Sequence, residues 1–172
     1  MVRWMCGLRD TVRFMSRCLL WLGFVFLVGC HTTEEGPFEG QQAPEFQGST
    51  LTGARATLAS FRNKPTVLVF WASWCAPCVK ETPEVRRVAD SYGERINVVG
   101  VNAGETQSQA RQAAGMMAIS WPVVLDVDGG IQKAYQVTGI PLVLVIDQDG
   151  LVRHRNNGMP SDIHRLLDGL LG

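Results

Sequence analysis

The stretch TVLVFWASWCAPC, residues 66–78, decides the fold. Residues 66–71 form a continuous apolar run, which is typical of a strand buried on both faces. We expect a helix to begin at Cys75, so that its sulfur lies at a helix N-terminus, where the partial positive charge stabilises a thiolate. The Cys78 sulfur lies one turn further, close enough to form a disulfide. The pair is therefore predicted to exchange two electrons with the cysteines of another protein.

Two cysteines at this spacing are also half of a structural zinc site, which needs two further ligands. The other cysteines, Cys6, Cys18 and Cys30, all lie near the N-terminus, and the three histidines are scattered along the chain. No second half-site is visible, which favours redox chemistry over zinc. We therefore expect neither a metal nor a resident cofactor.

Residues 1–29 predict a secretory signal peptide. Four arginines precede an apolar run at residues 18–29, which is shorter than the roughly 20 residues that span a bilayer. The end of this run, Leu27-Val28-Gly29-Cys30, resembles the lipobox of bacterial lipoproteins, which implies that Cys30 is lipidated and becomes the first mature residue. The alternative is an uncleaved anchor with an incidental cysteine. Both alternatives place the rest of the chain outside the cytoplasm.

The remaining chain divides into a short tether and one domain. Residues 30–40 hold Cys30 and a polar segment with glycine and proline, which predicts a flexible tether. Residues 41–172 are long enough for a single domain with its own core. The 172 residues include 16 basic and 16 acidic side chains without a basic stripe, so nucleic acid is not an expected partner.

The pattern of apolar runs predicts the order of strands and helices. Buried strands are expected at residues 66–71, 96–101, 122–125 and 142–146. Helices are expected at about 75–92, 105–117 and 161–171. The dipeptide Asp149-Gly150 predicts a tight hairpin turn before a strand at 151–155. This alternation predicts an α/β fold with a mixed central sheet flanked by helices.

Residues 69–78 resemble the active-site segment of thioredoxin-fold proteins, and more closely that of the membrane-tethered thiol-disulfide oxidoreductases of the TlpA/ResA type. Residues 43–46 resemble the A-P-x-F opening of that family, and residues 63–65 resemble its lead-in to the first central strand. Residues 139–150 resemble its G-x-P-x-x-x-x-I-D-x-D-G segment. The match covers residues 40–172. It implies a thioredoxin-like fold and a thiol-disulfide oxidoreductase.

The resemblance also implies a client-binding surface around the cysteines. It implies that the Ile140–Pro141 peptide bond is cis and faces the cysteine pair, where the backbone pairs with an extended segment of the client. The alternative is an ordinary proline at the start of a strand. Trp74, Ala76 and Pro77 are expected to complete this surface.

Glu81 lies three residues after Cys78, on the helical face that also carries Val85 and Val88. Burial of a carboxyl favours its protonated form, so such a group can exchange a proton near neutral pH. TlpA/ResA-type proteins carry a glutamate at this place, which implies a catalytic role for Glu81. The alternative is a glutamate at the rim of the helix whose carboxylate reaches water.

Trp71 is expected in the core. Trp121, Met116 and Met117 could line a binding surface, but large apolar side chains are most often buried, and we expect these three in the core as well. Trp74, directly before Cys75, is expected to be partly exposed.

The residues between the cysteines predict the direction of electron flow. Ala76 and Pro77 supply no cation or polar hydrogen to a Cys75 thiolate, which favours a reductase over a strong oxidant. The chain has no nicotinamide-binding signature, so a partner must supply electrons. The resemblance implies a membrane donor of the DsbD/CcdA kind, and clients such as apocytochrome c or the copper-site cysteines of oxidase. The expected location is the periplasmic side of a bacterial membrane.

Two other activities of the same fold remain as alternatives. A thiol peroxidase needs P-x-x-x-T/S-x-x-C, whereas Leu68 and Ala72 occupy the proline and threonine positions. A copper carrier uses C-x-x-x-C with a distant histidine. This chain has C-x-x-C, and His154 is the best of its three histidines for that role.

Overall fold

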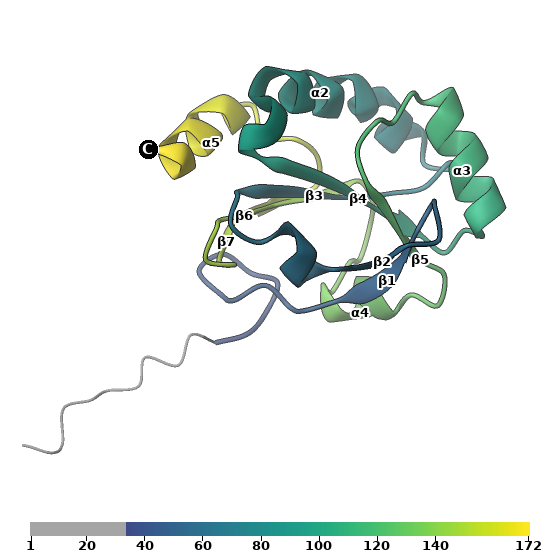
Figure 1. Cartoon of the computed structure of the whole chain (residues 1–172), viewed down its shortest axis with the longest axis horizontal. Helices are drawn as coiled ribbons and strands as arrows, with labels where there is room; N and C mark the ends of the chain where they lie inside the picture. The colour runs from purple at the N-terminus through teal and green to yellow at the C-terminus, as the bar shows by residue number, and fades with distance from the viewer. Residues whose placement is uncertain (1–33) are drawn as a thin grey trace, which may run out of the picture. The chain divides into compact units, whose positions relative to one another are not determined.

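The computed structural model describes residues 34–172 (Figure 1). Within them, seven strands form one mixed sheet in the order β2-β1-β5-β4-β3-β6-β7, and helices flank it, which confirms the predicted fold class. The strands are β1 (Gln47–Thr50), β2 (Arg55–Thr57), β3 (Thr66–Trp71), β4 (Asn97–Ala103), β5 (Val123–Asp126), β6 (Leu142–Ile146) and β7 (Val152–Asn156). The helices are η1 (Leu58–Phe61), α2 (Ala76–Tyr92), η2 (Gly93–Arg95), α3 (Gln107–Met116), α4 (Gly130–Ala134) and α5 (Ile163–Leu171).

Strand β3 lies at the centre and ends directly before the cysteine motif. It pairs in parallel with β4 and antiparallel with β6, so Val69 lies opposite Gly100 on one side and Val143 on the other. Every residue of β3 and β6 is buried, as their continuous apolar runs predicted. The predicted hairpin is also present, with Gly150 at a φ of 87° in the turn between β6 and β7.

The two faces of the sheet bury separate sets of side chains. Leu68 and Phe70 of β3 pack on the face covered by α4, whereas Val67 and Val69 pack on the face covered by α2 and α5. Figure 1 shows α2 and α5 on one side of the sheet and α4 on the other. Each large aliphatic side chain that is fully buried contributes roughly 1.5–3 kcal/mol, so this double packing holds the end of β3 firmly in place.

Strands β1 and β2 and helix α4 were not predicted. The two strands have three or four residues each, with polar and exposed side chains, so they lack the apolar pattern of a buried strand. Helix α4 has five residues and begins after Gly129, which has a φ of 74°. The carboxylate of Asp126 accepts the backbone N–H groups of Ile131 and Gln132 at 2.8 Å each, and this cap stabilises a helix too short to show a periodic pattern.

The folded part begins earlier than the predicted boundary at residue 41. The backbone N–H of Gly36 donates to the carbonyl of Gln42 at 2.9 Å, and that of Gly40 donates to the carbonyl of Val152 at 2.8 Å. Gly40 is therefore paired with β7, and Gly36 is held by the backbone of Gln42. The predicted signal peptide and Cys30 lie outside the described residues. Between residues 34 and 172, no helix is both long and apolar enough to cross a membrane.

Candidate active site

The cysteine motif forms a disulfide at the start of α2. Cys75 is the N-cap residue of this helix and is bonded to Cys78. The backbone N–H of Cys78 lies 3.2 Å from Cys75 Sγ and donates to it. Pro77 occupies the first turn, where its missing N–H has no intrahelical partner to lose. The helix N-terminus and this N–H favour negative charge on the Cys75 sulfur when the disulfide is reduced.

Exposure does not distinguish the two cysteines. Both cysteines are buried, because the disulfide packs against Ala113 and Ala114 of α3. Ala76 and Pro77, between them, are exposed. The two cysteines differ in position, because Cys75 is the N-cap residue and Cys78 lies inside the first turn of the helix.

The predicted cis bond between Ile140 and Pro141 is present. The carbonyl oxygen of Ile140 lies 3.5 Å from Cys75 Sγ, and β6 begins at the next residue, Leu142. The alternative of an ordinary trans bond at the start of a strand is therefore wrong. Cys75 and Ile140 are 65 positions apart in the sequence, and the fold brings them into contact. The backbone that leads into β6 therefore lies beside the disulfide.

Glu81 is half-buried and faces a small cavity beneath Cys78, which Pro141 and Trp121 also line. One carboxyl oxygen accepts the backbone N–H of Met159. The other has almost no access to solvent and no hydrogen-bond partner among the described residues. Of the two interpretations of Glu81, this geometry favours the inward-facing carboxyl over the one that reaches water.

Glu105, which was expected only at the start of a helix, lies beside the cysteine motif. It is buried, and its carboxylate accepts hydrogen bonds from the backbone N–H of Ser73 at 2.9 Å, from the Ser73 hydroxyl, and from Asn102 Nδ2 at 2.7 Å. Burial alone would raise the pKa of Glu105, but these hydrogen bonds outweigh it and lower the pKa below its ordinary value. Glu105 therefore holds the loop that leads into Cys75 as an ionised carboxylate.

The sequence signal for this role is a charged residue two positions after the end of the buried strand β4. A second signal is the capping box formed by Thr106 and Gln109. It indicates that α3 begins after Glu105 and not at Glu105.

The prediction that Met116 lies in the core is wrong. Trp71 is buried and Trp121 and Met117 are partly buried, but the side chain of Met116 is 79% exposed. The reason is helical periodicity. The inward face of α3 is made by alanines at positions 110, 113 and 114, and position 117 continues it, whereas position 116 points away. Trp74 is also largely exposed, as predicted.

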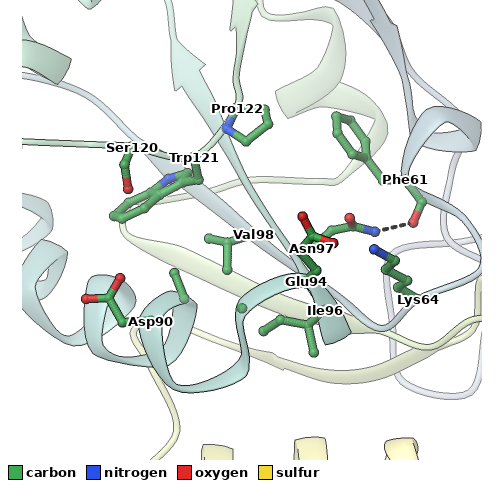
Figure 2. Close-up of a pocket in the computed structure, with 12 residues that line it drawn as sticks. Phe61, Lys64, Asp90, Glu94, Ile96, Asn97, Val98, Ser120, Trp121 and Pro122 are labelled. Carbon is green, nitrogen blue, oxygen red and sulfur yellow. Dashed lines mark hydrogen bonds between the residues drawn. The ribbon is translucent and has the colours of Figure 1, made fainter.

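A second, larger pocket lies away from the disulfide, near the C-terminal end of α2 (Figure 2). It encloses about 450 Å³ and is bordered by Lys64, Asp90 and Glu94 together with Trp121. Trp121 also lines the small cavity beneath Cys78. In the part of the chain from residue 34 onward, no three histidine, cysteine or carboxylate side chains gather as metal ligands would.

A disulfide at a helix N-terminus, after a central parallel strand and beside a cis proline, defines a thioredoxin-like thiol-disulfide oxidoreductase. Residues 39–155 match the model of the AhpC/TSA family, and the chain belongs to that family. It is 34% identical to the thioredoxin-like protein YneN of Bacillus subtilis over 123 residues, which cover 70% of this chain and 72% of YneN. It is 33% identical to the thiol-disulfide oxidoreductase ResA of Bacillus thuringiensis over 132 residues, 76% of each chain.

A solved structure shows the same architecture. The secreted Mycobacterium tuberculosis disulfide oxidoreductase homologous to E. coli DsbE superimposes with a TM-score of 0.61 and 27% identity, over 73% of this chain and 93% of that one. The predicted fold, the resemblance to ResA-type proteins and the activity as a thiol-disulfide oxidoreductase are thus confirmed. The relatives imply clients that are disulfide-bearing proteins.

Proposed function

We propose that this chain reduces disulfides in proteins outside the cytoplasm, with Cys75 as the nucleophile. The observation that carries the proposal is the position of Cys75 Sγ, which lies 3.2 Å from the N–H of Cys78 and 3.5 Å from the carbonyl oxygen of Ile140. The N–H favours the thiolate. The carbonyl marks the edge, beside Pro141, along which an extended client segment would pair with the backbone.

The chemistry is a two-step exchange that starts from the reduced chain. The Cys75 thiolate attacks one sulfur of the client disulfide, and the other client sulfur leaves as a thiolate that takes up a proton. Cys78 loses its proton and attacks Cys75 in the mixed disulfide, which releases the second client thiolate. Two electrons pass to the client, and the Cys75–Cys78 disulfide of the structure is the product state.

Glu81 is the group in place to take the proton from Cys78. Both residues line the same small cavity, and one oxygen of the carboxyl has no hydrogen-bond partner among the described residues. A carboxylate near a buried thiol can act as a general base when the mixed disulfide forms. The client contacts would come from Trp74, Ala76, Pro77, Ile140 and Pro141, all of which lie at or near the disulfide.

Features of the sequence support the proposed direction and location of the reaction. Ala76 and Pro77 add no stabilisation to the thiolate beyond the helix itself, which supports a reductase. The signal peptide and lipobox support a chain held by lipid on Cys30 at the outer side of a bacterial membrane. A relative of known structure is described as secreted, which agrees with this location. The electron donor would be a membrane protein of the DsbD/CcdA kind, and the clients would include apocytochrome c or the copper-site cysteines of oxidase.

The redox potential tests the direction. The protein is equilibrated with dithiothreitol buffers of graded potential, and its free thiols are counted by alkylation and mass spectrometry. We expect a single two-electron transition far below the value of about −120 mV that characterises the strong oxidant DsbA. A potential near that value would make the chain an oxidase.

A second experiment tests the lipid anchor. Cells that express the chain are labelled with a palmitate analogue, with Cys30→Ser as the control. A wild-type chain that takes up no label would contradict the proposed lipidation of Cys30.

A further inference from the structure

Large apolar side chains gather around the disulfide on the outside of the molecule. In residues 34–172, five large apolar side chains are exposed, and three of them belong to this region: Trp74 (70% exposed), Val79 (43%) and Met116 (79%). Trp74 precedes Cys75 and Val79 follows Cys78. Single exposed apolar side chains are common, but several that cluster on one surface mark an interaction site.

Two of these side chains, Val79 and Met116, line a groove of about 310 Å³ between α2 and α3. Its lining residues come from three segments that the sequence separates: Ser73 from the loop before Cys75, Val79 and Pro83 from α2, and Ala113, Met116 and Met117 from the end of α3. On α2, positions 79 and 83 are one turn apart and share a face with Arg86. The groove thus runs along α2, and Ser73, two residues before Cys75, lies at its border.

The groove offers no free charge to a ligand. Its one charged lining residue is Arg86, and the guanidinium of Arg86 donates to the carbonyl oxygens of Met117 at 2.6 Å and Ala118 at 3.1 Å. These bonds tie the end of α3 to α2, so the walls of the groove are held in place before a ligand binds. The 450 Å³ pocket of Figure 2 differs, because Lys64, Asp90 and Glu94 border it.

We propose that the groove between α2 and α3 binds a bulky apolar side chain of the client polypeptide, close in sequence to the client cysteine. This inference rests on the proposed function, because it adds a site to the same exchange reaction. The groove is continuous with the surface at which the exchange takes place: Cys75 and Cys78 pack in one cluster with Ala113 and Met117 of its wall. A client whose sulfur is joined to Cys75 therefore has its neighbouring residues beside the groove.

The chemistry of the walls determines which side chains fit. Methionine side chains are flexible and polarisable, and they adapt to apolar groups of different shape. The groove therefore selects for leucine-like or aromatic side chains as a class, rather than for one residue. It would act together with backbone pairing at Ile140, which carries little information about sequence.

The test uses two short synthetic peptides that each contain one C-x-x-C disulfide and differ only in their flanking residues, phenylalanine in one and serine in the other. The reduced full-length protein is mixed with each peptide, and kcat/KM or the single-turnover rate is measured. We expect the wild type to prefer the phenylalanine peptide by about ten-fold or more, as is usual for one apolar side chain in a pocket. Met116→Glu should bring this ratio close to one, and Met116→Leu, which keeps the apolar volume, should preserve it.

A matched control is Val127→Glu. Val127 is also an exposed apolar residue (59%), but it lies in the turn between β5 and α4, outside the groove, and this variant should keep the wild-type ratio. Equal ratios in the wild type, Met116→Glu and Val127→Glu would overturn the inference. A second result would also overturn it: the wild type is a dimer, and Met116→Glu dissociates the dimer without changing the preference for the phenylalanine peptide. A second copy of the chain would then occupy the groove. Failure to reduce either peptide would overturn the proposed function itself, whereas equal reduction of both would overturn only the groove.

Discussion

Glu105 and Ser73 are joined by two hydrogen bonds, one from the Ser73 backbone N–H to Oε2 at 2.9 Å and one from the Ser73 hydroxyl to Oε1. The same carboxylate accepts Asn102 Nδ2 at 2.7 Å. Since Asn102 belongs to β4, this carboxylate connects the central sheet to the loop that carries Trp74 and ends at Cys75. The position of the disulfide thus depends on a buried charge 30 residues away in the sequence.

The first prediction concerns the removal of that carboxylate. Glu105→Ala should lower the free energy of unfolding by about 2–4 kcal/mol, because the buried donors of Ser73 and Asn102 lose their acceptor, at roughly 1–3 kcal/mol each. Denaturant unfolding of the oxidised protein measures this change. Glu105→Gln, which keeps one carbonyl oxygen, should cost less. Glu94→Ala, at an exposed position in η2, should change stability by less than about 0.5 kcal/mol. Equal stability of Glu105→Ala and Glu94→Ala would contradict the role of Glu105.

The second prediction is a pH dependence with a definite sign. Folding lowers the pKa of Glu105 below its ordinary value of 4.5. The stabilisation from this group is therefore complete above pH 4.5 and is lost as the pH falls through the lowered pKa. We expect the difference in stability between the wild type and Glu105→Gln to narrow as the solution is acidified below pH 4.5. A difference that stays constant, or grows, on acidification would show that Glu105 is not ionised in the folded protein.

The third prediction concerns Glu81 and the resolving step. Glu81→Gln should slow exchange with a disulfide peptide by roughly 100-fold, the lower end of what a general base contributes, and should shift the pH profile of cysteine alkylation. Glu84→Gln is the matched control. It lies on the same helix, but its carboxylate pairs with Arg87 on the surface. If both variants keep the wild-type rate and profile, Glu81 has no part in proton transfer.

The fourth prediction concerns the attachment of α5 to α2. The hydroxyl of Tyr92 lies 3.0 Å from both the carbonyl oxygen of His164 and Asp168 Oδ1, and the Tyr92 ring stacks on that of His164. Tyr92→Phe keeps the stacking and removes the hydroxyl, so it should lower the free energy of unfolding by about 1–1.5 kcal/mol. Thermal and denaturant unfolding measure this change, with Ser91→Ala at an exposed neighbouring position as the control. An unchanged midpoint for Tyr92→Phe would mean that these hydrogen bonds do not stabilise the fold.

Much of the central sheet could be predicted from the sequence, for a physical reason. Strands β3 and β6 begin and end where their apolar runs do. A strand that is buried on both faces is apolar at nearly every position, so the apolar run has the same length as the strand. The cysteine motif was equally clear, since a thiol pair after such a strand has few structural alternatives. Strands β1 and β2 were missed because their stability comes from pairing at the sheet edge and not from their own side chains.

Parts of the site could not be predicted because they depend on contacts across the chain. The hydrogen bonds between Glu105 and Ser73 join residues 32 positions apart, and no local sequence pattern predicts a contact over that separation. The exposed position of Met116 follows from the phase of α3, which the adjacent pair Met116-Met117 leaves ambiguous. The buried alanines at positions 110, 113 and 114 determine the inward face, and Met116 lies on the outer side.

The central claim is that Cys75 and Cys78 pass their electrons to another polypeptide. Its most direct test mixes the reduced wild-type protein with an equimolar disulfide peptide, quenches the mixture in acid and measures both masses. We predict that the protein loses two hydrogens while the peptide gains two, and that Cys78→Ser instead accumulates a mixed disulfide between Cys75 and the peptide. A protein that keeps both thiols beside an intact peptide disulfide, when dithiothreitol reduces the same peptide, would contradict the account.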